Sequence, residues 1–133
     1  MSYPLEEKQK PLALIVEDDD EQVSIFAEAL RRAEYETEVA QDGQLALTRL
    51  GEIVPDLVVL DLHLPYISGR EILRQIRTNA RLAETRVIIA TAAPSTADML
   101  RHEADLVLIK PISFIQLRDL ATRMRPPDTV DQL

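Results

Sequence analysis

The chain has 133 residues, of which 46% are hydrophobic, a composition that suits one compact domain with a buried core. Its formal net charge of −8, from 15 basic and 23 acidic residues, argues against direct binding to nucleic acid or to an anionic membrane. The sequence contains no cysteine, which excludes disulfides, thiolate nucleophiles and cysteine-ligated zinc. The apolar stretches are too short to cross a bilayer and the start lacks the pattern of a secretory signal, so we expect a cytoplasmic protein.

The pattern of apolar residues predicts five strands that alternate with five helices. Short apolar or β-branched runs predict strands at 12–16, 35–40, 57–61, 87–91 and 106–109. Apolar residues at helical spacing predict helices at 21–33, 43–51, 69–79, 95–103 and from 113 onwards. Capping-box patterns mark the starts of the last two helices, Ser95 with Asp98 and Ser113 with Gln116. We expect one domain over residues 11–124, with flexible ends at 1–10 and 125–133.

This alternation predicts an α/β fold in which a parallel sheet is covered by helices on both faces. In such sheets the ligand binds beyond the carboxyl ends of the strands, where the strand order reverses. Four of the predicted strands end in polar residues that would meet at this edge: Glu17 and Asp18, Asp61, Thr91, and Lys110. Taken alone, the acidic run 17–21 is typical of a solvated loop ahead of a helix. Together, these strand ends predict one polar site.

The acidic residues of this predicted site point to a bound divalent cation. Three carboxylates in a small crevice repel one another, and their pKa values rise unless a cation compensates. Mg²⁺ prefers one or two carboxylates, several waters and phosphate oxygens. Asp18 and Asp61 suit direct ligands, while Glu17 suits a direct or a water-mediated contact. His63 offers at most its backbone carbonyl.

Asp61 can also act as a nucleophile on phosphorus and form an aspartyl phosphate. Phosphoryl transfer depends mainly on positioning and on neutralising the charge of three equatorial oxygens. The metal would contact one of these oxygens and the Lys110 ammonium a second. The Thr91 hydroxyl and nearby backbone N–H groups would contact the third. The residue types therefore match a phosphoryl-acceptor site.

Several short motifs together resemble the receiver domain of bacterial two-component response regulators. They are Val16-Glu17-Asp18-Asp19, the stretch 55–65 around Asp61, Gly69, Thr91-Ala92, Ala104-Asp105 and Lys110-Pro111. The resemblance implies a flavodoxin-like, doubly wound (βα)5 fold with a five-stranded parallel sheet in the order 2-1-3-4-5. It implies Asp61 as the phosphoacceptor, Glu17 and Asp18 as the metal-site acids, Thr91 as the switch hydroxyl and Lys110 as the phosphate-binding lysine. It also implies a cis peptide bond before Pro111.

The same resemblance implies a signalling role and its partners. A histidine kinase or phosphotransfer protein would phosphorylate Asp61 in the presence of Mg²⁺, and the product would change docking to a downstream protein. Such a module is not an enzyme towards external substrates, because it catalyses only its own phosphorylation and dephosphorylation. The sequence leaves the oligomeric state open.

Two departures from the family pattern bear on how a signal would leave the domain. Receivers usually carry an aromatic residue three positions before the lysine, where this chain has Val107, a short side chain that is stiff at χ1. The segment between Thr91 and Lys110 is also about one helical turn shorter than usual. We therefore expect a short fourth helix, entered at Pro94, and a reshaped signalling face.

Two other functions stay open at this stage. A degenerate receiver would act as an interaction module without phosphorylation, a role that Val107 and the short helix favour. A Mg²⁺-dependent phosphohydrolase of the aspartyl-phosphate type would need a second carboxylate two residues after the nucleophile, where His63 stands. The arginines at 70, 74, 77, 81 and 86 are expected to form a solvated face.

Overall fold

The computed structural model describes residues 9–127, and every strand and helix predicted from the sequence is present in that range. The strands are β1 (Leu12–Val16), β2 (Glu36–Ala40), β3 (Leu57–Asp61), β4 (Arg86–Thr91) and β5 (Leu106–Ile109). The helices are α1 (Asp20–Arg32), α2 (Gly43–Leu50), α3 (Gly69–Thr78), the short 3-10 helix η2 (Ala80–Leu82), α4 (Pro94–Leu100) and α5 (Phe114–Arg123). The ends expected to be flexible, 1–10 and 125–133, fall largely outside the described residues. Between residues 9 and 127, none of the helices has the length and apolar character needed to span a membrane.

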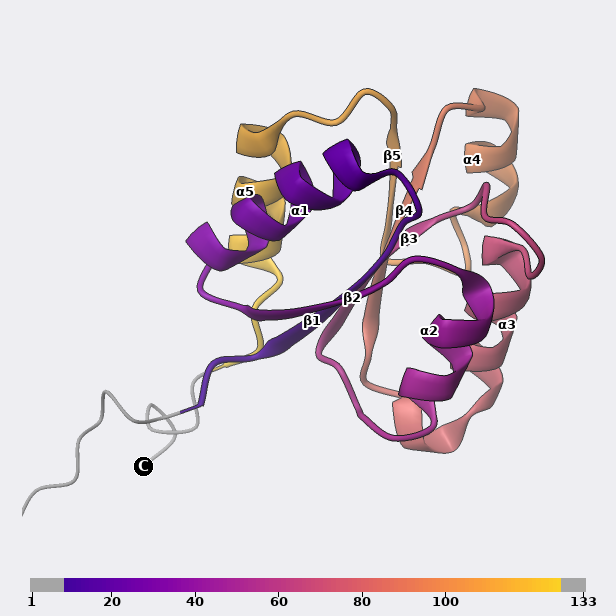
Figure 1. Ribbon diagram of the computed structural model, residues 1–133, viewed down its shortest axis with the longest axis horizontal. Helices are drawn as coiled ribbons and strands as arrows, with labels where there is room; N and C mark the ends of the chain where they lie inside the picture. The colour runs from indigo at the N-terminus through magenta and orange to yellow at the C-terminus, as the bar shows by residue number, and fades with distance from the viewer. Residues whose placement is uncertain (1–8, 128–133) are drawn as a thin grey trace, which may run out of the picture.

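The five strands form one parallel sheet in the order β2-β1-β3-β4-β5, which confirms the predicted topology. Helices α1 and α5 cover one face, and α2 and α3 cover the other, with α4 next to α3 near one end (Figure 1). The register pairs Val16 of β1 with Leu60 of β3, and Asp61 of β3 with Ala90 of β4. The carboxyl ends of these strands therefore lie side by side at one edge of the sheet.

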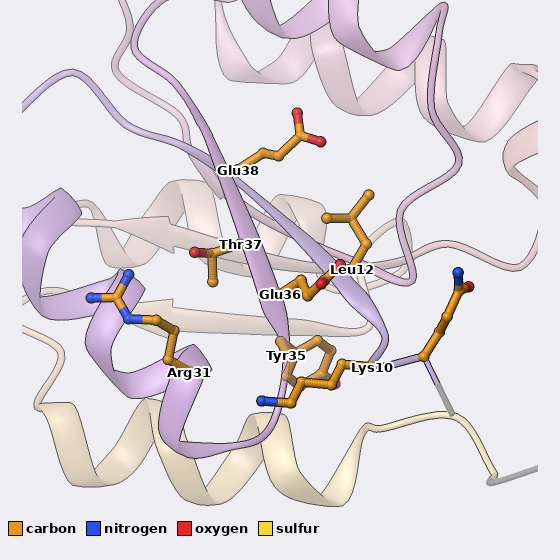
Figure 2. Close-up of a pocket in the computed structure, with 8 residues that line it drawn as sticks. Lys10, Leu12, Arg31, Tyr35, Glu36, Thr37 and Glu38 are labelled. Carbon is orange, nitrogen blue, oxygen red and sulfur yellow. The ribbon is translucent and has the colours of Figure 1, made fainter. Parts of the chain in front are cut away.

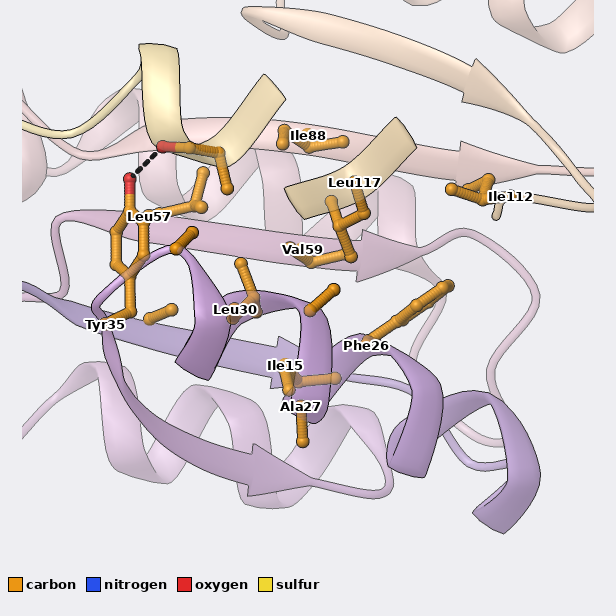
Figure 3. Close-up of a cluster of buried hydrophobic side chains, with 14 of the residues drawn as sticks. Ile15, Phe26, Ala27, Leu30, Tyr35, Leu57, Val59, Ile88, Ile112 and Leu117 are labelled. Carbon is orange, nitrogen blue, oxygen red and sulfur yellow. Dashed lines mark hydrogen bonds between the residues drawn. The ribbon is translucent and has the colours of Figure 1, made fainter. Parts of the chain in front are cut away.

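Each face of the sheet carries its own hydrophobic cluster. On one face, Phe26 and Leu30 of α1 and Leu117 of α5 pack against side chains of β1, β3 and β4 (Figure 3). The Tyr35 hydroxyl donates a hydrogen bond to the Ala121 carbonyl at 2.9 Å inside this cluster. A second cluster joins α2, α3 and the end of α4 to the other face. Each fully buried large side chain contributes about 1.5–3 kcal/mol, so these clusters hold the strand ends in a fixed arrangement.

Four of the α-helices begin with a side chain that accepts a backbone N–H. These N-caps are Asp19, Asp42, Ser68 and Ser113. Each cap satisfies one of the amides that a helix leaves unpaired at its start. At α5 the Ser113 hydroxyl accepts from the Gln116 N–H at 3.0 Å, which confirms this half of the predicted capping box.

The fourth helix is entered at Pro94 as expected, but its predicted cap and its predicted C-terminal end were wrong. The helix begins at Pro94 with Ala93 as its N-cap, and no side chain caps it. Pro94 suits the first helical position because its missing N–H would be unpaired there. The Ser95–Asp98 capping box is therefore absent, and Asp98 instead pairs with Arg101 at 3.2 Å. The helix stops at Leu100, whose carbonyl accepts from both Glu103 and Ala104, so the fourth helix is short, as expected.

Two of the arginines expected on a solvated face are exposed and also bind backbone carbonyls. Arg77, at the end of α3, donates to the Glu103 carbonyl at 2.7 Å, to the Thr85 carbonyl at 3.0 Å and to the Asp105 carboxylate at 3.0 Å. Arg81 donates to the carbonyls of Leu50 and Ile53. A guanidinium presents five N–H donors in a planar fork, so one side chain can join several chain segments. These two arginines tie α3 and η2 to the loops around them.

Candidate functional site

Polar side chains from four strands meet at the carboxyl edge of the sheet. Glu17 and Asp18 follow β1, Asp61 ends β3, Thr91 ends β4 and Lys110 follows β5. Each lies at or just after the carboxyl end of an apolar strand, and Glu17, Asp61 and Thr91 are buried there. All of the side chains that the sequence assigned to the site therefore come from one edge.

The three carboxylates lie close together. One oxygen each from Glu17, Asp18 and Asp61 lies within 4.8 Å of the others. Glu17 is 1% exposed and Asp61 is 4% exposed, whereas Asp18 is open to solvent. The Lys110 ammonium lies between two of these acids, with its Nζ 3.1 Å from Glu17 Oε1 and 3.5 Å from Asp61 Oδ1. The site thus carries three acids and one base.

Electrostatics show that this lysine does not fully compensate the acids. Burial raises the pKa of Glu17, and the charge of Asp61 raises it further, although the hydrogen bond from Lys110 acts in the opposite direction. Burial on its own would lower the pKa of Lys110, but the charge of Asp61 and the bond to Glu17 outweigh it and raise that pKa. The Lys110 ammonium is therefore held in its charged form, while burial and the neighbouring Asp61 disfavour the charged form of Glu17.

The two carboxylate oxygens of Asp61 have different surroundings. The Oδ1 atom accepts the His63 N–H at 3.1 Å and lies near the Lys110 ammonium. The Oδ2 atom makes no hydrogen bond with any residue between 9 and 127. One oxygen is thus held in place and the other is free for chemistry.

Gly69, the first residue of α3, lets the chain return to the Asp61 backbone. A Cβ atom at position 69 would lie 2.5 Å from the Asp61 carbonyl oxygen and 2.7 Å from the Leu62 Cα. Such distances are far below a normal contact, so the close approach requires a residue without a side chain. Gly69 is one of the motif residues in the sequence, but its contact with Asp61 could not be predicted from sequence spacing.

Thr91 is fully buried beside this cluster. Its Oγ1 accepts the Ala93 N–H at 3.1 Å, and its carbonyl accepts the Lys110 N–H at 2.8 Å. The hydroxyl hydrogen has no acceptor among residues 9–127. Val107, at the position where receivers usually carry an aromatic residue, is half-buried and packs against the second hydrophobic cluster.

The donor set fits a hard divalent cation. It consists of carboxylate oxygens, with no cysteine in the chain to favour a softer metal. A backbone N–H also holds Glu17, because Asp19 N–H lies 3.3 Å from Glu17 Oε2. Asp19 is itself the N-cap of α1. The three acids can therefore hold a metal ion, whereas the role of the His63 carbonyl stays a prediction.

An open groove of about 750 Å³ lies elsewhere on the molecule, beside β2. Figure 2 shows Lys10 ahead of β1, Arg31 near the end of α1, and Glu36 and Glu38 on β2 around it. The residues around this groove include none of those predicted for the site. Asp56 precedes β3, at the opposite end of that strand from Asp61, and its carboxylate accepts the Leu12 N–H at 2.8 Å.

Comparison with known proteins agrees with this geometry. The family profile described as "Response regulator receiver domain" matches residues 13–122. The "Probable methanogenesis regulatory protein FilR2" of Methanothrix harundinacea is 34% identical, over 89% of this chain and 87% of its own length. The "Transcriptional regulatory protein TrcR" of Mycobacterium tuberculosis is 35% identical over 84% of this chain, which spans only 43% of TrcR.

Solved structures give the same result. The signal receiver domain of a "putative Luxo repressor protein" from Vibrio parahaemolyticus has a TM-score of 0.78 and 28% identity, over 86% of this chain and 89% of that one. Chemotaxis response regulator CheY4 of Vibrio cholerae has a TM-score of 0.79 over 87% of this chain and 99% of its own, and at 24% identity it supports the fold alone. The Lys110–Pro111 peptide bond is cis, as the resemblance implied. The chain belongs to the receiver domain family of two-component response regulators.

Proposed function

We propose that Asp61 accepts a phosphoryl group from a phosphohistidine on a histidine kinase or phosphotransfer protein. The observation that carries this proposal is the free Oδ2 atom of a buried aspartate, beside a lysine and two further acids. In the transfer, Oδ2 attacks phosphorus and a P–O bond forms while the P–N bond of the donor breaks. The electron pair stays on the imidazole nitrogen of the donor, which takes up a proton.

Lys110 and Thr91 would stabilise the phosphoryl group once it is attached. The ammonium of Lys110 already lies 3.5 Å from Asp61 Oδ1, so a small movement would bring it to a phosphoryl oxygen. The Thr91 hydroxyl has a hydrogen to donate to another oxygen. Hydrolysis would then reverse the state, since attack of water on phosphorus breaks the bond to Asp61 and releases inorganic phosphate.

Glu17, Asp18 and Asp61 would hold Mg²⁺, together with the backbone carbonyl of His63. Bound there, Mg²⁺ would neutralise charge on the phosphoryl oxygens. The fit rests on the all-oxygen donor set and on the buried Glu17, whose pKa is raised by burial and by Asp61.

The phosphorylated chain would act by binding a downstream protein, with residues 11–124 as the functional unit. Helix α4 has only seven residues, so the surface around it differs from the one that the family commonly uses. We place this function in the cytoplasm, because the donor obtains its phosphoryl group from ATP. Function as an interaction module without phosphorylation is the alternative that the next experiment excludes.

The proposal is tested by incubating the protein with acetyl phosphate and Mg²⁺ and measuring its intact mass. The unmodified protein should gain the mass of one phosphoryl group, and EDTA should prevent the gain. Asp61→Asn should gain none. Asp56→Asn is the matched control, because it alters an aspartate at the other end of the same strand and should be labelled normally. The proposal would be refuted if Asp61→Asn gained the phosphoryl mass, or if the unmodified protein did not gain it.

A further inference from the structure

Tyr66 is a strained and highly exposed aromatic residue in the loop between β3 and α3. Its φ is +71°, in the left-handed region that residues other than glycine rarely adopt. The Ile67 N–H donates to the Pro65 carbonyl at 2.9 Å, so the chain reverses within three residues, as in the strained form of the γ-turn. The Tyr66 side chain is 94% exposed, and therefore internal packing does not offset this strain.

Glu34 has the same φ of +71°, but a helix end explains it. The Tyr35 N–H donates to the Leu30 carbonyl and the Glu34 N–H to the Arg31 carbonyl. This is the Schellman pattern, in which a left-handed residue satisfies the last carbonyls of a helix. Tyr66 lies two residues ahead of the Ser68 cap and outside any helix end. The strain at Tyr66 therefore calls for another explanation.

The backbone on both sides of Tyr66 is held rigidly. Pro65 has a fixed φ. Ile67 packs against the start of α2 so closely that a Cβ atom on Gly43 would lie 2.6 Å from its own Cβ. The Tyr66 side chain thus projects outwards from a fixed support. A tyrosine has few rotatable bonds, so a ring presented in this way loses little entropy when a partner covers it.

The loop that carries Tyr66 forms part of the rim of the acceptor site. It leaves the sheet at Asp61, where the His63 N–H binds the Asp61 carboxylate, and it returns at Gly69 against the Asp61 carbonyl. Asp61 itself is only 4% exposed. A protein that brings phosphorus to within bonding reach of Asp61 must therefore lie over this rim. A small phosphate donor can reach the same atom without covering the loop.

The rim also carries charge that selects the partner. Asp18, whose carboxylate lies beside Asp61, is followed by Asp19, Asp20 and Glu21, and all four are exposed. Like charges opposite these acids would be repelled, whereas basic side chains would be attracted. A fitting partner therefore has basic residues around its phosphohistidine and an apolar pocket for an aromatic ring.

We propose that Tyr66 anchors the protein phosphodonor by inserting its ring into such a pocket, and so determines which donors phosphorylate Asp61 efficiently. This inference rests on the proposed function of Asp61. It assigns Tyr66 to docking and not to the chemistry, so protein donors and small donors should respond differently to its removal.

The test compares two donors on the same variants. The protein donor is a histidine kinase autophosphorylated with radiolabelled ATP, chosen from a panel as the fastest donor for the unmodified chain, and the small donor is acetyl phosphate. For Tyr66→Ala, the ratio of the protein-donor rate to the acetyl phosphate rate should fall on the order of tenfold. Tyr66→Phe should keep the ratio, because it retains the ring. Tyr66→Gly should behave like Tyr66→Ala, which shows that the ring and not the strain is responsible.

Val54→Ala is the matched control, because it removes another exposed apolar side chain, 51% exposed, just ahead of the amino end of β3. Its ratio should stay unchanged. A ratio for Tyr66→Ala within about twofold of the unmodified protein would overturn the proposal, and so would an equal fall for Val54→Ala. A failure of the underlying function looks different, since acetyl phosphate would then not label the unmodified chain at all.

Discussion

Gly69 and Asp61 are in direct backbone contact, and this contact sets the geometry of the acceptor loop. A methyl group on Gly69 would lie 2.5 Å from the Asp61 carbonyl oxygen, which belongs to the rigid backbone of β3. The Asp61 backbone cannot move far, because β3 is paired with β1 on one side and with β4 on the other. The start of α3 is therefore fixed relative to Asp61, the proposed phosphoacceptor.

Gly69→Ala should accordingly damage both stability and function. We expect the free energy of unfolding to fall by about 2 kcal/mol, because overpacking forces the backbone to shift. Labelling by acetyl phosphate should slow as well, since the shift moves Asp61. Urea denaturation measures the first effect and intact mass the second. Gly51→Ala is the control. Its added Cβ atom would lie 3.3 Å from the nearest atom, the Thr48 carbonyl oxygen, so the free energy of unfolding should change by about 0.5 kcal/mol or less.

Arg77 should be important for stability although it lies far along α3 from the site. Arg77→Lys keeps the charge but loses the fork that reaches two carbonyls and the Asp105 carboxylate together. We expect the free energy of unfolding to fall by about 1–2 kcal/mol, a value that allows for the partial exposure of the Arg77–Asp105 pair. Hydrogen exchange at the Val87 N–H should also accelerate, because that amide donates to the same Asp105 carboxylate at 2.7 Å.

Arg74→Lys provides the comparison for this prediction. Arg74 lies one turn earlier on the same helix, and its Glu71 pair is exposed. Exposed ion pairs contribute little to stability, so the free energy of unfolding of this variant should lie within about 0.5 kcal/mol of that of the unmodified protein. Equal losses for both variants would show that the carbonyl contacts of Arg77 do not contribute to stability.

The sequence was sufficient to predict the fold and the residues at the carboxyl edge. Buried strands leave a clear apolar pattern, and a parallel sheet brings strand ends such as Asp61 and Lys110 together whatever the loops do. The cap of α4 was mispredicted because Ser95 and Asp98 match a capping-box pattern, while Pro94 already begins the helix. A local pattern cannot show which of two adjacent residues begins a helix.

Other features of the structure depend on contacts between segments distant in sequence. Tyr66 has a φ of +71°, and the next residue, Ile67, lies against Gly43 at the start of α2. The bonds of Arg77 reach residues 8 to 28 positions away. Neither residue has a periodicity or a motif that would have distinguished it from an ordinary surface residue.

Tyr35 should introduce a measurable dependence of stability on alkaline pH. Burial raises the pKa of Tyr35 to about 12, whereas an unfolded tyrosine titrates near 10. Below pH 10 the side chain is neutral in both states and makes no pH-dependent contribution. Between about pH 10 and 12 only the unfolded state loses its proton, so the stability falls with rising pH, by about 2–3 kcal/mol in all.

Tyr35→Phe isolates this effect, because all other titrating groups are unchanged. At neutral pH the variant should be less stable by about 1 kcal/mol, since it loses the hydrogen bond to the Ala121 carbonyl. Towards pH 12 the variant should become the more stable protein, because it has no phenol to ionise when unfolded. Denaturation curves of both proteins at matched pH values measure the crossing, and parallel pH profiles would contradict the prediction.

Asp61→Asn should stabilise the protein without metal and destabilise it relative to the unmodified chain with metal. In EDTA the substitution removes one of two buried neighbouring acids and leaves the Glu17–Lys110 pair intact, so we expect a gain of about 1 kcal/mol. Saturating Mg²⁺ stabilises whichever protein binds it, by an amount that grows with the ratio of its concentration to the dissociation constant. The unmodified protein should therefore gain more stability from Mg²⁺ than Asp61→Asn does.

Thermal denaturation with EDTA and with Mg²⁺ measures the reversal. Asp56→Asn is the control, and its stability should respond to Mg²⁺ as that of the unmodified protein does. Equal responses of Asp61→Asn and the unmodified protein would mean that Asp61 does not bind the ion.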